Sequence, residues 1–231
     1  MRAEATDPSL MFAIREAAPT DLRAVAALHR QCIAEGFLST LGEGFLARLY
    51  RAIASDPGST VLVPPGEDGS APQGFVAGTV DTSAMYRRVL GRQWLWFALA
   101  LAPAALKPAT AKRILETMRY GRRAEAGRQT SGVTAELLAI AVAPGSRGKG
   151  VGRSLVAGLE AFFAERGVKE YKVVTSAADP VSNAFYAACG FALRREFAHH
   201  GNPMREYVRT CGQAREWNAD DAEHTDCRGD I

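Results

Sequence analysis

Apolar and polar residues alternate along the first 83 residues in a pattern that predicts a strand, two helices and a hairpin. A short apolar run over 12–17 predicts the strand, and residues 19–21 mark the start of a helix. The second helix ends at the turn-forming residues 56–58. Its apolar face consists of Phe45, Leu46, Leu49, Tyr50 and Ile53. The β-rich runs 60–63 and 74–80 flank a turn-forming stretch and predict a hairpin.

From residue 133 to residue 210 the pattern predicts alternating strands and helices. The run 134–142 is apolar apart from Glu136, which is typical of a central strand buried on both faces. A glycine-rich turn over 145–152 then leads into an amphipathic helix. Further along, Asp179-Pro180 predicts the N-cap and the first residue of another helix. The remaining β-rich runs predict three further strands, over 171–175, 191–198 and 204–210.

Three segments do not fit this alternation. Residues 84–131 contain ten Lys or Arg, and their apolar run, 94–102, is far shorter than the ~20 residues that a membrane helix needs. We predict a helical insertion there, with three open interpretations: a lid or wall on the domain, the surface of a homodimer, or a contact with a membrane or a lipid-like substrate. Residues 1–11 are predicted to be a flexible lead-in and residues 211–231 an acidic, disordered tail.

Composition indicates one globular domain that needs no metal or disulfide to fold. The 231 residues are 47% hydrophobic and 23% charged, which is ordinary for a domain of this size. The formal net charge of +3 predicts no nucleic-acid partner. The four cysteines form no CxxC pair, so we expect reduced thiols, no metal site and a cytoplasmic protein. The first residues lack the apolar core of a signal peptide, and no integral membrane segment is expected.

The glycine-rich turn has the composition of a phosphate-binding loop. A helix that begins after a buried strand leaves backbone N–H groups unpaired and carries a partial positive charge, so it attracts a phosphate. Gly148, Gly150 and Gly152 would let the backbone approach this phosphate, and Arg147 and Lys149 add positive charge. Taken alone, the string is equally compatible with a tight turn that carries basic residues on its surface.

Two motifs in this order resemble those of the GNAT superfamily of N-acetyltransferases. The pyrophosphate loop of that family reads Arg/Gln-x-x-Gly-x-Gly/Ala, and the segment 147–152 matches it at each fixed position. The second motif is a helix that carries a tyrosine and is followed closely by Gly-Phe, which Tyr186 and Gly190-Phe191 satisfy. The resemblance covers residues 12–83 and 132–210.

The resemblance implies an α/β fold and acetyl-CoA as the co-substrate. The expected fold is a mixed, twisted sheet of about seven strands flanked by helices, in a single domain over 12–210. Tyr186 would protonate the departing thiolate. Asp179 departs from the asparagine of many members, so only its role as helix cap is carried over. The residues expected to bind the cofactor are Leu138, Ile140, Ala141, Val142, Arg147, Gly148, Lys149, Gly150, Val151, Gly152 and Asn183.

Glu136 is the candidate general base. An ammonium has no lone pair with which to attack a thioester, and a carboxylate in the site can accept its proton, directly or through a water. Glu136 is a lone acid in an apolar strand beside the expected acetyl position. The competing interpretations are that Glu136 pairs with an arginine at an exposed strand start, and that Tyr186 is a core tyrosine. No serine or cysteine has the setting of a nucleophile, which favours direct transfer.

The acceptor is less defined by the sequence. We expect a primary amine of a small molecule, and the stretch 35–42 resembles bacterial members that acetylate small amines, with amino sugars as one class. A peptide or protein amine is the rival substrate, and a non-catalytic module that senses acyl-CoA is the rival function. Glu35, His199 and His200 are weaker candidates for contacts with the acceptor, and the apolar insertion leaves the acyl chain length open.

Overall fold

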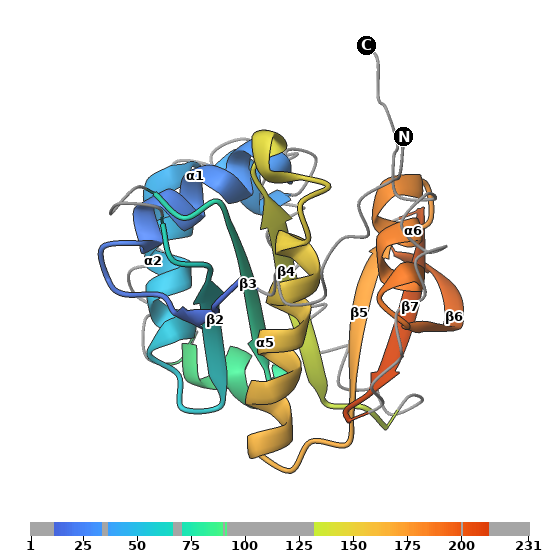
Figure 1. Ribbon diagram of the computed structural model, residues 1–231. Helices are drawn as coiled ribbons and strands as arrows, with labels where there is room; N and C mark the ends of the chain where they lie inside the picture. Colours follow the sequence, from blue (N-terminus) through green and yellow to red (C-terminus); the bar gives the residue numbers. More distant parts are fainter. Residues whose placement is uncertain are drawn as a thin grey trace, which may run out of the picture.

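The computed structural model describes residues 12–33, 37–66, 71–89, 91, 132–199 and 201–212, and these form a seven-stranded mixed sheet flanked by helices (Figure 1). The strand order is β1-β2-β3-β4-β5-β7-β6. The strands are β1 (Arg15–Glu16), β2 (Ser59–Val63), β3 (Gly74–Thr79), β4 (Ala135–Val142), β5 (Glu170–Ser176), β6 (Ala192–His199) and β7 (Asn202–Thr210). The helices are α1 (Leu22–Cys32), α2 (Glu43–Ala54), α5 (Val151–Glu165) and α6 (Pro180–Ala188), with short 3-10 turns η1 (Phe37–Leu41) and η3 (Pro144–Ser146).

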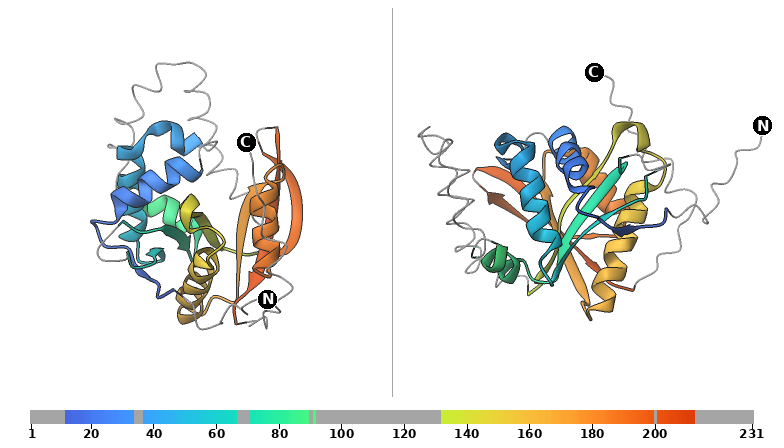
Figure 2. Two further views of the ribbon diagram at one scale, coloured as in Figure 1. Left: turned by 45° about the horizontal axis from the view of Figure 1, so that its top comes forward. Right: turned by 90° about the vertical axis from the view of Figure 1, so that its left-hand side faces the viewer.

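The helices cover the two faces of the sheet in pairs (Figure 2). The apolar sides of α1 and α2 pack on β2 and β3, around Leu46 and Phe75. On the other face, α5 and α6 pack against the apolar residues of β4, β5 and β7. The predicted hairpin of β2 and β3 and the final strand pair are confirmed, since both pairs are antiparallel. The predicted cap of α6 is confirmed as well, because Asp179 Oδ1 accepts the Ser182 N–H at 3.1 Å.

A β-bulge changes which residues of β4 face each helix layer. The register with β3 slips near Leu138, which falls between the paired residues Leu137 and Ala139. Before the slip, Ala135 and Leu137 pack in the α5 core. After it, Ile140 and Val142 do so, while Leu138, Ala139 and Ala141 pack toward α1 and α2. β4 is therefore apolar on both faces, as the sequence predicts.

β4 and β5 are parallel neighbours that separate soon after they meet. Their paired residues are Ala135 with Tyr171 and Glu136 with Lys172. Beyond these pairs the strands diverge toward the C-terminal end of β4, and α5 begins after the loop that follows this open end (Figure 1). The separation divides the sheet into two halves that share a short base.

The start of the predicted insertion is part of the domain. Residues 82–89 form a helix whose Met85 and Val89 are buried against the α1 and α2 core. Arg88 pairs with the buried Asp56, with 2.5 Å between Nε and Oδ1. Residues 92–131, which hold the Trp- and Leu-rich run, lie outside the described residues, as do the predicted lead-in and residues 213–231 of the tail. Within the ranges that the structure describes, no helix is long and apolar enough to cross a membrane.

A buried histidine links α1 to α2. His29 is 5% exposed, and its Nδ1 lies 2.6 Å from the hydroxyl of Tyr50. Its ring stacks on Phe75, and the Tyr50 ring meets Phe75 edge-on. Burial lowers the pKa of His29 below its ordinary value of 6.5, because the imidazolium loses its hydration.

We expect His29 to make the fold sensitive to mild acid. The unfolded chain takes up a proton at His29 near pH 6.5 and the folded chain does so only at lower pH, so stability falls as the pH drops below about 6.5. Urea unfolding at pH 7.5 and 5.5 should show this loss, at up to about 1.4 kcal/mol per pH unit. The variant His29→Gln should show a clearly smaller loss. An equal loss in both proteins would contradict the assignment.

Candidate active site

β4 has an unpaired backbone edge where it leaves β5. β3 pairs with β4 as far as Val142, whereas β5 pairs with it only at Ala135 and Glu136. Among the described residues, the backbone groups of 137–142 that point toward β5 therefore have no strand partner. An extended ligand can hydrogen-bond such an edge as an added strand does. The residues predicted to hold the cofactor arm lie in this segment: Leu138, Ile140, Ala141 and Val142.

The loop over 147–152 leaves open space above its glycines. Gly148 and Gly150 have φ of +73° and +83°, a left-handed conformation that strains any residue with a Cβ. A Cβ built on either glycine would meet no atom within 4 Å. Gly150 caps α5, and the N–H groups of the first turn of this 15-residue helix point out of it without intrahelical acceptors. The loop fits a pyrophosphate, because it combines free N–H donors, a positive helix end and room.

The two basic residues of the loop differ in how they are held. Arg147 donates from Nε to the carbonyl oxygen of Val142 at 3.3 Å, which ties the loop to the end of β4. The Cys32 thiol also contacts this oxygen, at 3.6 Å. A contact between Val142 and the cofactor arm would have to leave these two bonds in place. Lys149 is exposed and extends the positive charge of the loop.

Close packing of two helices explains why residue 152 is a glycine, and the sequence alone does not show this contact. A Cβ at this position would lie 3.0 Å from Cε2 and 3.2 Å from Cζ of Phe185. Gly152 therefore lets α5 pack closely on α6, and its expected role of admitting a phosphate is not needed to explain it. Phe185 precedes Tyr186 in α6, so this contact helps to position the predicted acid.

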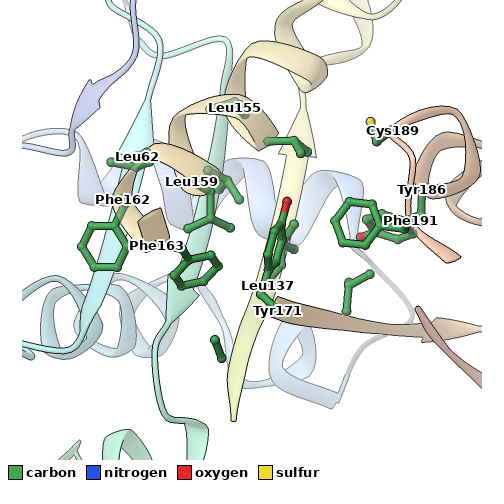
Figure 3. Packing of buried hydrophobic residues seen from close by; sticks show 14 of the residues in the cluster. Leu62, Leu137, Leu155, Leu159, Phe162, Phe163, Tyr171, Tyr186, Cys189 and Phe191 are labelled. Carbon is green, nitrogen blue, oxygen red and sulfur yellow. The ribbon is translucent and has the colours of Figure 1, made fainter. Parts of the chain in front are cut away.

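Tyr186 projects from α6 into the core between α6 and the sheet (Figure 3). The residue is 6% exposed, and its ring packs edge-on against Phe185 and Phe191, each at 5.5 Å between centroids. Burial raises the pKa of Tyr186, with smaller contributions from the nearby Cys189 and Asp179. The phenol therefore keeps its proton at neutral pH, as a general acid must.

Asn183 is a structural residue in this fold. Its Nδ2 donates to the carbonyl oxygens of Ser176 and Asp179, and its Oδ1 accepts from the Tyr207 hydroxyl at 2.9 Å. The amide thus ties α6 to the end of β5 and to the middle of β7, and both its N–H bonds are used inside the protein. Its expected contact with the cofactor arm stays a prediction that would have to use the remaining lone pair of Oδ1.

Glu136 points to the opposite face of the sheet from Tyr186. Its neighbours Ala135 and Leu137 point into the α5 core, so Glu136 faces the side of α1 and α2. The side chain is half-buried, and Oε2 accepts a hydrogen bond of 2.8 Å from the Thr82 hydroxyl. Among the described residues Glu136 forms no ion pair with an arginine, which was the competing interpretation. Sequence reasoning missed Thr82, because nothing in the chain marks it apart from its place at the start of helix 82–89.

The other candidates are not brought together by the structure. Glu35, His200 and the side chain of His199 lie outside the described residues. No group of three or more His, Cys, Asp or Glu residues that could hold a metal ion occurs in the described ranges.

We expect Gly152→Ala to disturb the packing of α5 on α6. The added methyl overpacks the contact with the Phe185 ring, which should cost about 1–3 kcal/mol. The double variant with Phe185→Leu, which lacks the two atoms in contact, should recover stability in urea unfolding. Gly145→Ala is the matched control, because its Cβ would meet nothing within 4 Å. Equal stability of the Gly152 and Gly145 variants would contradict this role.

Comparison with known proteins identifies the family. A family model described as "Acetyltransferase (GNAT) family" matches residues 30–191, which is more than half of the chain. A phosphinothricin acetyltransferase from Sinorhizobium meliloti, solved in complex with AcCoA, has a similar fold, with a TM-score of 0.55 at 19% identity over 88% of this chain and 90% of that one. A ribosomal-protein-alanine N-acetyltransferase from Brucella melitensis matches with a TM-score of 0.54 at 18% identity, over 86% and 99%. A search of curated proteins found no match.

Proposed function

The chain belongs to the GNAT family of acetyltransferases, and from this premise we propose that it moves the acetyl group of acetyl-CoA onto a primary amine of a small molecule. The observation that carries the proposal is the place where β4 and β5 separate. Glu136 approaches it from the face of α1 and α2, and Tyr186 lies on the face of α5 and α6. A base and an acid are therefore available on opposite sides of the edge at which the co-substrate would bind.

Residues of the loop and of β4 would hold acetyl-CoA. The N–H groups of 147–152 bind the pyrophosphate, with added charge from Arg147 and Lys149. The free edge of β4 binds the extended arm through its backbone groups. Bound there, acetyl-CoA supplies the thioester carbonyl that the amine attacks.

The proton transfers are assigned to two side chains. Glu136 accepts a proton from the acceptor ammonium, directly or through a water, and so frees the lone pair of the nitrogen. The Thr82 hydroxyl holds the orientation of this carboxylate. Tyr186, which is protonated at neutral pH, donates its proton to the departing sulfur. No covalent enzyme intermediate is needed.

A small acceptor is favoured by the enclosure of the polar groups on the Glu136 face. Lys172, the strand partner of Glu136, is 2% exposed, and Glu206 on β7 is 1% exposed. The similar structures include enzymes that are named for a small molecule and for a ribosomal protein. A peptide or protein amine is therefore the alternative acceptor. Amino sugars are one class of small amine to test.

The proposal is tested by thiol release from acetyl-CoA with a panel of amino sugars, polyamines, amino acids and peptides. Turnover with small amines but not with peptides supports it. Turnover with peptides alone would show that the acceptor is a peptide or protein amine and not a small molecule. Tight binding of acetyl-CoA without turnover across the panel would instead favour a non-catalytic sensor. Longer acyl-CoAs in the same assay test the acyl chain length.

We expect Tyr186→Phe to lower kcat by about 10²–10⁴-fold, because the leaving sulfur loses its proton donor. Binding of acetyl-CoA, measured by thermal shift, should be retained. Tyr207→Phe is the matched control, since it removes a hydroxyl from the same buried cluster but one that bonds to Asn183. Full activity of Tyr186→Phe would identify this residue as a core tyrosine only.

Thr82→Val should lower kcat/KM by about 10- to 150-fold, the cost of one lost hydrogen bond to a charged group. Thr82→Ser keeps the hydroxyl and should restore most of the rate. Both variants need similar melting temperatures for the comparison to hold. If the valine and serine variants are equally impaired, Thr82 acts through packing and not through Glu136.

A further inference from the structure

β5 carries a buried lysine on the face opposite the core under α5 and α6. Tyr171 and Val173 point into the core under α5 and α6. Lys172 lies between them and therefore points to the opposite face, yet it is 2% exposed. Among the described residues it has no hydrogen-bond or ion-pair partner. Its nitrogen is not among the fully buried side-chain atoms that lack a partner, so the tip of the side chain keeps some access to solvent. A charge with so little access to water and no partner in the protein is costly, which points to an anionic group that is supplied by a ligand.

Lys172 stands beside the candidate base. Lys172 and Glu136 are the last paired residues before β4 and β5 diverge, and neighbouring strands lie about 4.8 Å apart. Their side chains leave the same face of the sheet, as those of strand partners do. They nevertheless form no ion pair within 4.0 Å in the described structure. The two opposite charges therefore do not neutralise each other, and each can bind a charged group of a ligand.

The ion pair of Glu206 with Arg195 does not neutralise Lys172. Glu206 of β7 is the strand partner of Val174, two residues further along β5, and so lies on the same face as Lys172. Its Oε2 accepts from Arg195 at 3.0 Å, so this carboxylate already has a cation. Its Oε1 is buried and has no hydrogen-bond partner, a second sign that this face is short of partners without a ligand.

We propose that Lys172 and Glu136 together select an acceptor that carries an anionic oxygen group close to its amine, as an amino acid or an aminoalkyl phosphate does. The inference rests on the proposed function and narrows its acceptor class. Lys172 binds the anionic group, and this contact places the ammonium beside Glu136, which removes its proton. An acceptor with an amine alone leaves Lys172 unpaired.

The test measures binding by calorimetry in the presence of CoA, so that no turnover is needed. The probes are α-amino acids, each paired with its α-amide, and 2-aminoethyl phosphate, paired with 2-aminoethanol. The wild-type protein should bind the charged member of at least one pair about tenfold or more tightly than the neutral member. Lys172→Met keeps the length and the apolar stem of the side chain. It should lower the affinity for that charged probe by about 30-fold and the affinity for its neutral partner by less than threefold.

Lys169→Met is the matched control. It makes the same change of charge at an exposed position just before β5 and should leave both affinities unchanged. The inference is overturned if no charged probe binds to the wild-type protein, if the charged member is never preferred, or if Lys172→Met weakens both members equally. Thiol release separates this from the proposed function. If neutral amines are acetylated as fast as charged ones, the inference about Lys172 is wrong and the proposed function stands. If charged probes bind but are not acetylated, the proposed function is wrong and the inference about binding stands.

Discussion

The separation of β4 from β5 is the constraint on which the rest of the site depends. Among the described residues, only two residue pairs join β4 to β5. Beyond them, the backbone groups on this edge of β4 must find partners other than a strand. The chain that leaves this end of β4 forms the glycine-rich loop and the N-terminus of α5, so the anion site adjoins the free edge. The proposed co-substrate site therefore depends on one local interruption of strand pairing.

The bulge at Leu138 determines which side chains of β4 lie on each face of the sheet where β4 and β5 separate. Because the register slips there, Glu136 lies on the face of α1 and α2, while the strand still gives Ile140 and Val142 to the core beneath α5. The residues that follow on the Glu136 face include the small side chains Ala139 and Ala141. In a regular strand Glu136, Ile140 and Val142 would all lie on the same face, because they are separated by even numbers of residues.

Local features of the chain were predictable, and contacts between distant segments were not. The Asp179 cap, the β2–β3 hairpin and the buried β4 follow from short patterns whose physics is local. The contact of Gly152 with Phe185 and the bond from Thr82 to Glu136 join elements far apart in sequence, and no pattern within either segment encodes them. The apolar run of β5 likewise gave no sign that Lys172 would stand beside Glu136, because strand register is set by tertiary packing.

The charges on the Glu136 face are a cost to the fold that packing alone does not explain. Burying an ion pair is often no better for stability than filling the same space with apolar side chains, and an unpaired ion is worse. β5 shows the alternative within its own length, since the two residues that follow Lys172, Val173 and Val174, are ordinary apolar side chains. A valine or leucine at 172 would suit the strand as well. This charge lies one strand away from the candidate base, at the point where the sheet opens. The acceptor that we propose, which needs both charges at once, would account for its position.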